Sequence, residues 1–156
     1  MELIAQVEYE NHFSKELIKM IVRTEALDTE LFLKLFNSVG WTAPSKAQVD
    51  MALNNSFATF VAYEKEQPVG MARLLGDGGM SFYIKDFVVL PKAQGKGVGR
   101  LLLEAMEKYI RDTIPVDWAV SLELISTIEA QKFYEKMGFE VRPCEWDGPG
   151  MFKMLR

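Results

Sequence analysis

Hydrophobic positions recur along the chain with two periods, and these periods predict a series of short helices and strands. Two helices are expected first. Asp28 has the position of an N-cap for a helix that runs to about Asn37, and Pro44 and Ser45 open a second short helix. A longer helix is predicted over 98–112, and a last one over 127–137 ends at Gly138, which suits a left-handed C-cap.

Runs rich in β-branched and aromatic residues predict the strands. They cover 18–23, 57–64, 69–76, 81–89, 119–125, 139–142 and 151–155. The resulting order (β, α, α, β, β, β, α, β, α, β, β) indicates an α/β fold with a sheet of mixed direction. Residues 1–17 leave two alternatives, an N-terminal extension or an extra strand (LIAQVEY), before a domain spanning 18–156.

Length, net charge and the counts of cysteine and histidine limit which kinds of protein this sequence can encode. The chain has 156 residues and a net charge of −4, so a single domain is expected and no nucleic-acid partner. No apolar run approaches the roughly 20 residues of a membrane span, and the N-terminus does not resemble a signal peptide, so a cytoplasmic location without membrane association is expected. With one cysteine (Cys144) and one histidine (His12), no metal site is expected.

The stretch QGKGVGR at 94–100 carries the clearest chemical signal, because three glycines alternate just before a predicted helix. Glycine reaches positive φ at low cost and lets a ligand approach the backbone. Unpaired amides at a helix N-terminus bind anions, and Lys96 and Arg100 add positive charge. The pattern satisfies neither the P-loop nor the dinucleotide fingerprint. A flexible strand-to-helix turn remains the alternative to a phosphate site.

Two motifs together resemble a known family. QGKGVG at 94–99 is similar to the acetyl-CoA loop of the GNAT superfamily of N-acetyltransferases, and FYEKMGF at 133–139 is similar to its second signature. One strand separates the two signatures, as in that family. The resemblance implies a GNAT-like α/β fold: a mixed, mostly antiparallel central sheet flanked by about four helices, with a splayed pair of central strands.

The resemblance also implies a set of residues that bind acetyl-CoA as co-substrate. Val88 and Val89 would pair with the pantetheine arm through their backbones, and Ser126 or Thr127 lies where many members have an asparagine that touches the same arm. The pyrophosphate would be held by the loop residues Gln94, Gly95, Lys96, Gly97, Val98, Gly99 and Arg100.

For catalysis, the resemblance assigns Tyr134 to protonation of the departing thiolate and a backbone N–H near Val88 to the oxyanion. The general base is open, because Lys85 stands where many members carry a glutamate. Asp86 is the candidate site carboxylate, acting through water or anchoring a loop amide. Strict alternation groups Asp86 with Phe82, Ile84 and Val88, and a β-bulge would break that grouping.

The acceptor is expected to be a primary amine of a small molecule, attacked directly in a ternary complex. Trp41, Tyr83 and Lys85 are the candidate acceptor-binding residues. Two alternatives remain: a non-catalytic acyl-CoA-binding module, and an enzyme that acetylates a protein lysine or N-terminus. A homodimer is common in the family, and no sequence feature decides for or against it.

Overall fold

A computed structural model describes residues 2–10, 17–24, 27–151 and 153–154. The chain divides into two compact units, Met1–Glu123 and Leu124–Arg156, and each is described by itself. The first unit contains the whole β-sheet and three of the α-helices.

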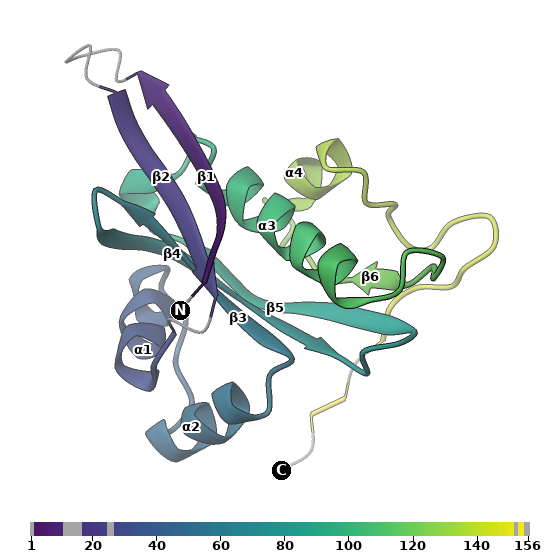
Figure 1. Cartoon of the computed structure of the whole chain (residues 1–156). Coiled ribbons are helices and arrows are strands. Elements are labelled where there is room, and N and C mark those ends of the chain that lie inside the picture. Colours follow the sequence, from purple (N-terminus) through teal and green to yellow (C-terminus); the bar gives the residue numbers. More distant parts are fainter. Residues whose placement is uncertain (1, 11–16, 25–26, 152, 155–156) are drawn as a thin grey trace. The chain divides into compact units, whose positions relative to one another are not determined.

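The sheet of the first unit has six strands whose spatial order follows the chain (Figure 1). Neighbouring strands from β1 to β5 are antiparallel, and β5 pairs with β6 in parallel. The predicted mixed, mostly antiparallel sheet is therefore confirmed. The strands are β1 (Leu3–Glu10), β2 (Leu17–Thr24), β3 (Ala58–Glu64), β4 (Gln67–Gly76), β5 (Ser81–Val89) and β6 (Ser121–Glu123).

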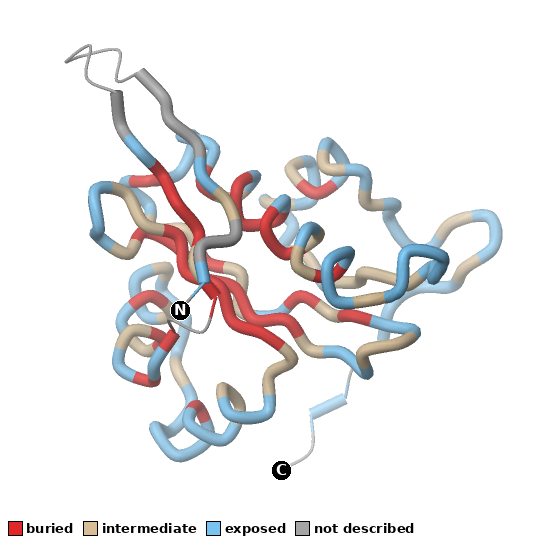
Figure 2. Tube along the Cα trace, in the orientation of Figure 1, coloured by how far each residue is buried: buried red, intermediate tan, exposed pale blue. Residues whose placement is uncertain are grey.

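Helices cover both faces of this sheet. On one face, α1 (Thr29–Ser38) and α2 (Lys46–Asn54) bury Phe32, Leu35 and Val49 against Val61 of β3 and its neighbours. On the other face, α3 (Val98–Thr113) packs its Tyr109 ring edge-on against Phe60, with ring centroids 5.5 Å apart. Phe60 and Val61 are consecutive in β3 and point to opposite faces, and both are fully buried because both faces are covered. Figure 2 shows the central strands of the sheet as mostly buried.

Local capping explains where the first two helices begin. The Asp28 carboxylate accepts a hydrogen bond of 2.8 Å from the Leu31 N–H, as predicted for an N-cap. Ser45 and Gln48 form a reciprocal capping box at the start of α2. Both caps were readable from the sequence because they need only local residues.

The N-terminal residues add a strand. Leu3–Glu10 form β1, which pairs antiparallel with β2 from Leu3↔Arg23 to Glu10↔Leu17. Of the two alternatives for residues 1–17, the structure has the strand over this range, whereas His12 lies outside the described residues.

The second unit differs from the prediction at its end. Residues 139–142 form no strand, and neither do Met151, Lys153 and Met154, whereas 152 and 155 lie outside the described residues. Proline has no N–H to donate, and Pro143 and Pro149 fall where these strands would have to continue a ladder. The chain instead closes a tight turn in which the Cys144 N–H donates to the Asp147 carbonyl at 2.9 Å.

Two other predicted elements are shorter than expected. The strand expected over 119–125 is β6, Ser121–Glu123, and the last helix is α4 (Gln131–Lys136) instead of 127–137. Gly138 follows α4 with φ of +90°, the left-handed conformation predicted for it. Among the described residues, no helix has the length and apolar character needed to cross a bilayer.

Asp77 organises the turn between β4 and β5 and provides a test of this local structure. Its carboxylate accepts hydrogen bonds from the N–H groups of Gly79, Met80 and Ser81 at 2.8–3.1 Å. These bonds lower the pKa of Asp77 from 3.8 to about 2. Because the folded pKa is depressed, the carboxylate stabilises the fold above its unfolded pKa, and this contribution is lost as the pH falls towards 2.

We therefore expect Asp77→Asn to be less stable than the parent protein at neutral pH, with the difference shrinking as the pH approaches 2. Urea unfolding at both pH values measures it. Asp112→Asn, which removes an exposed carboxylate paired with Lys108, is the matched control. A difference between parent and Asp77→Asn that is independent of pH would contradict the assignment.

Candidate active site at the end of β5

The ladder between β5 and β6 ends early. It pairs Ser81 with Ser121, Phe82 with Leu122, and Tyr83 with Glu123, while β5 itself continues to Val89. β6 is itself only three residues long and lies at the edge of the described sheet, so the predicted splay of two central strands stays a prediction. The carboxyl-terminal half of β5, which holds Val88 and Val89, extends beyond that ladder and leads through a short 3-10 helix, Pro91–Ala93, into the glycine loop.

A β-bulge interrupts β5 within this half. Met71 of β4 pairs with Val88 and Arg73 pairs with Lys85, so three steps along β5 match two along β4. Asp86 takes φ of +49° at the bulge, a left-handed conformation in which aspartate is enriched. The extra residue changes which side chains share a face of the sheet.

Because of the bulge, residues before and after it no longer alternate regularly between the two faces of the sheet, and this changes the neighbours expected for Asp86. Phe82, before the bulge, packs edge-on against Phe57, a neighbour of α3's Tyr109, with ring centroids 5.0 Å apart. Val88, after the bulge, belongs instead to the core formed with α1. The grouping of Asp86 with Phe82 and Ile84 is therefore wrong, for the reason foreseen with the bulge.

Asp86 is engaged in an ion pair. Its Oδ2 accepts from Arg73 Nε at 2.6 Å, and the two side chains are 15% and 10% exposed. Sequence reasoning missed Arg73 as a site residue. Its signal was a single charged side chain within the apolar run VGMARLLG, since an arginine in such a strand is rarely buried without a partner.

The loop after β5 has the geometry expected of an anion site. Gly95 and Gly97 have φ of +74° and +86°, and Gly97 is the N-cap of α3. The helix ladder starts with the Leu101 N–H donating to the Gly97 carbonyl at 3.0 Å. The amides of the first helical turn, including Val98 and Gly99, therefore have no acceptor within α3 and lie at the positive end of its dipole.

The two cations of the loop are paired with carboxylates. Lys96 Nζ lies 3.4 Å from Glu64 Oε1, and Arg100 Nε lies 2.7 Å from Glu104 Oε1. Glu104 raises the pKa of Arg100 through this hydrogen bond and its charge. The Arg100 side chain remains 71% exposed, so it is accessible to a ligand.

Gln94 connects the loop to β5. Its side-chain amide donates to the Val89 carbonyl at 3.1 Å, and the Leu90 N–H donates to the Val69 carbonyl at 2.8 Å. These two bonds fix the point where strand passes into loop. Val88, Val89 and residues 94–100 are thus brought together on one continuous path in the first unit.

The candidate acceptor residues belong to the first unit as well. Trp41, in the connection between α1 and α2, is 38% exposed and packs edge-on against Phe36 at 5.0 Å between centroids. Lys85 is exposed, and Tyr83 is half-buried. Burial raises the pKa of Tyr83, and the charge of Glu123 adds to this.

The second unit holds the remaining predicted residues. Tyr134 is 9% exposed in α4, and its ring contacts Phe133 and Phe139 edge-on at 5.0 and 5.7 Å between centroids. Burial raises the pKa of Tyr134 to about 12, so its hydroxyl stays protonated at neutral pH. Thr127 is exposed in the turn before α4. Within the described part of the chain, no cluster of His, Cys, Asp and Glu has the makings of a metal site.

Together, the strand, the glycine turn and the helix that follows have the geometry that the resemblance to acetyl-CoA-dependent acyltransferases implies. Comparison with protein families agrees: residues 55–141 match the model described as "Acetyltransferase (GNAT) domain". The chain belongs to the GNAT family of acetyltransferases. Enzymes with this fold generally use acetyl-CoA as co-substrate.

Solved and curated relatives support the family. A probable acetyltransferase from Staphylococcus aureus is 32% identical, with a TM-score of 0.74 over 87% of this chain and 99% of that one. The chloroplastic GCN5-related N-acetyltransferase 1 of Arabidopsis thaliana is 34% identical over 77% of this chain and 60% of its own length. The chain spans 60–64% of the first curated relatives that it matches.

Names of more distant relatives cover two kinds of acceptor. Histone acetyltransferase TAP1 of Glycine max is 27% identical over 81% of this chain and 58% of its own length. Serotonin N-acetyltransferase 2, chloroplastic, of Oryza sativa is 26% identical over 81% of this chain and 64% of its own length.

The conformation of Gly97 is directly testable. A Cβ at this position would meet no atom within 4 Å, so only the left-handed backbone disfavours a side chain. We expect Gly97→Ala to lower the free energy of unfolding by about 1–2 kcal/mol. Gly97→Asn should lose less, because asparagine tolerates this conformation.

Urea unfolding of the three proteins provides the measurement. Gly99→Ala serves as the matched control, since Gly99 lies within the helix without a positive φ. Equal stability of the parent and Gly97→Ala proteins would show that the loop does not hold Gly97 in this conformation.

Proposed function

We propose that the protein transfers the acetyl group of acetyl-CoA to a primary amine of a small molecule, by direct attack in a ternary complex. The observation that carries the proposal is the path from the end of β5 through the left-handed glycines into α3. It combines an extended strand, a turn that exposes amides and a helix N-terminus.

The loop fits the phosphates of coenzyme A. Gly95 and Gly97 leave open space where a side chain would otherwise stand, and the amides of the first turn of α3 have no acceptor within the helix. Lys96 and Arg100 carry the positive charge needed beside a pyrophosphate. Bound acetyl-CoA supplies the activated acetyl group, and Val88 and Val89 hold the pantetheine arm through their backbone groups.

Tyr134 is the proposed acid. Its pKa of about 12 keeps the phenol protonated at neutral pH, so a hydroxyl donor is available to the departing thiolate. A backbone N–H of β5 near Val88 donates to the oxyanion. Thr127 takes the place of the family's pantetheine-contacting asparagine.

Deprotonation of the amine is proposed to proceed through water. The Asp86 carboxylate is held by Arg73, and Lys85, at the position of the family's usual glutamate, is a cation. A water molecule that takes the proton from the attacking amine avoids the need for a carboxylate in direct contact with it.

A small amine is favoured as acceptor by the aromatic residues near α1 and β5. Trp41 presents a partly exposed indole, and Tyr83 adds a phenol. Aromatic faces hold apolar amines and cations. The relative named as a serotonin N-acetyltransferase is in keeping with such an acceptor, whereas the relative named as a histone acetyltransferase makes a protein lysine the competing choice.

The experiment has two stages. Calorimetry with acetyl-CoA and with CoA tests binding, and release of free CoA thiol is then followed across a panel of aromatic amines, aliphatic amines and a lysine-containing histone peptide. Binding with turnover on small amines supports the proposal. Turnover on the peptide alone would overturn the small-molecule acceptor, and binding without turnover on any acceptor would indicate a non-catalytic acyl-CoA-binding module.

Tyr134→Phe tests the acid. We expect kcat to fall about 10²- to 10⁴-fold, because the variant keeps the ring packing and loses only the donor. The pH profile of the parent should show no basic limb due to Tyr134 at neutral or mildly basic pH, since its pKa is about 12. Tyr109→Phe, in the aromatic cluster on α3, is the control. Unchanged turnover in Tyr134→Phe would remove this tyrosine from the mechanism.

A further inference from the structure

Arg73 is a buried charge that the proposed chemistry does not use. It lies in the middle of β4 and is only 8% exposed, although its neighbours Ala72 and Leu74 are fully buried apolar residues. A charge in such a place needs several good partners, because its desolvation is otherwise uncompensated.

The Arg73 guanidinium has partners in two separate elements. Nε donates to Asp86 Oδ2 in the β5 bulge at 2.6 Å. Nη1 donates to the Ala52 carbonyl in the last turn of α2 at 3.1 Å and to Ser56 Oγ in the following connection at 3.0 Å. Ser56 Oγ in turn donates to the same Ala52 carbonyl at 2.7 Å.

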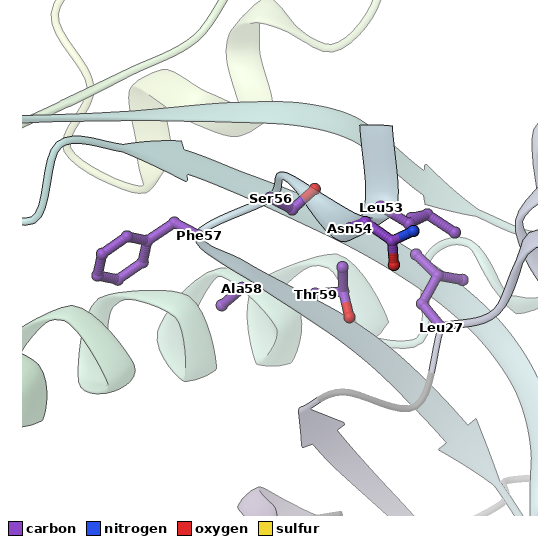
Figure 3. A pocket seen from close by; sticks show the side chains of 7 residues that line it. All are labelled: Leu27, Leu53, Asn54, Ser56, Phe57, Ala58 and Thr59. Carbon is purple, nitrogen blue, oxygen red and sulfur yellow. The ribbon is translucent and has the colours of Figure 1, made fainter. Parts of the chain in front are cut away.

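The connection after α2 borders open space, so its hydrogen bond with Arg73 matters more for its position. A cavity of about 280 Å³ lies at this corner, and Figure 3 shows that Leu27 from the connection before α1, Asn54 from the end of α2 and Thr59 from β3 line it. Ser56 also lines it. The end of α2 and the connection after it are thus incompletely packed where they border the cavity, and Arg73 of β4 holds them through Ala52 and Ser56.

At its other end, the guanidinium fixes the bulge. Asp86 adopts φ of +49°, and the bulge determines that Val88, two residues later, points its side chain into the α1 core. The direction of the backbone N–H groups at this end of β5 depends on the same bulge. Removing the ion pair would let β5 shift its register towards regular alternation.

We propose that Arg73 is a positioning residue for acetyl transfer, which holds the β5 bulge through Asp86 and the end of α2 through Ala52 and Ser56. The inference rests on the proposed function, in which β5 carries the oxyanion donor and Trp41, in the connection between α1 and α2, borders the acceptor. Arg73 keeps β5, beside which the acetyl group would lie, at a fixed distance from the end of α2. The amine would then meet the acetyl carbon in a productive geometry.

Arg73→Gln, Asp86→Asn and the double variant test this role through kinetics. We expect each single variant to lower kcat about 10- to 100-fold, since displacements near 1 Å have effects of that size. The Km for acetyl-CoA should rise less than kcat falls, because the glycine loop is untouched and only the proposed contacts of Val88 and Val89 with the pantetheine arm are displaced. The double variant should lose no more than the worse single variant, since both substitutions break one unit.

A general-base role for Asp86 predicts other results. Asp86→Asn would then abolish the acidic limb of the kcat/Km profile, while Arg73→Gln would keep most of the activity. Under the positioning role, the acidic limb persists in both variants and both lose kcat. Loss confined to Asp86→Asn, or additive losses in the double variant, would overturn the proposal.

Amide hydrogen exchange gives a readout that does not need activity. Without substrates, the amides of residues 86–89 should exchange faster in both single variants than in the parent, and unchanged exchange would overturn the proposal. Arg23→Gln, which breaks the Arg23–Glu66 pair on β2 and the β3–β4 turn, is the control and should leave exchange at 86–89 unchanged. If Arg73→Gln does not fold, Asp86→Asn carries the test, because it keeps the size of the side chain and removes the charge that pairs with Arg73.

Exchange also separates this inference from the proposed function. A protein that fails to bind acetyl-CoA would refute the function, while faster exchange at 86–89 would still establish that Arg73 holds the bulge. Binding and turnover with unaltered kcat in Arg73→Gln would refute the positioning role alone.

Discussion

The short ladder between β5 and β6 is the constraint on which the rest of the first unit depends. Strand pairing normally continues as far as two neighbouring strands allow, because each buried backbone group requires a partner. Here the ladder covers Ser81–Tyr83 while β5 runs to Val89. A ligand that presents amide and carbonyl groups along an extended chain is the natural complement to such a strand.

The bulge at Asp86 explains how β5 serves two roles. Before the bulge, Phe82 packs into the aromatic cluster beside α3, and after it Val88 packs into the core beside α1. A regular strand would have kept both side chains on one face. The extra residue therefore anchors each half of β5 in a different core, and Arg73 pairs with the residue that makes this possible.

Sequence reasoning succeeded where the determinants are local. The caps at Asp28 and Ser45, the left-handed Gly138 and the start of α3 at Val98 all follow from residues within a few positions of each element. The fold class followed from two separated motifs. The mixed sheet and the GNAT family are confirmed, whereas the roles assigned to individual site residues and the cytoplasmic location stay predictions.

The misses have a common physical origin, because they depend on contacts between distant residues. Alternating hydrophobicity cannot locate a bulge, and the sequence therefore did not show on which face of the sheet Asp86 lies. In the structure Asp86 pairs with Arg73, which lies thirteen positions earlier in the chain. The strands expected over 139–142 and 151–155 had suitable composition but needed ladder partners, and prolines interrupt that region. Local sequence propensity indicates where helices and strands can form, and pairing with a neighbouring strand decides whether a candidate strand does form.

In the glycine loop, the backbone amides and the charged side chains contribute to anion binding in different ways. Lys96 and Arg100 already contact Glu64 and Glu104, in a protein whose net charge is −4. Exposed ion pairs of this kind are worth only about 0–1 kcal/mol, so either cation can exchange its carboxylate for a phosphate at little cost. The amides at the start of α3 have no such competitor within the helix and keep their direction whether or not an anion is present. The backbone therefore provides the fixed geometry of the site, and the side chains add charge that follows the ligand.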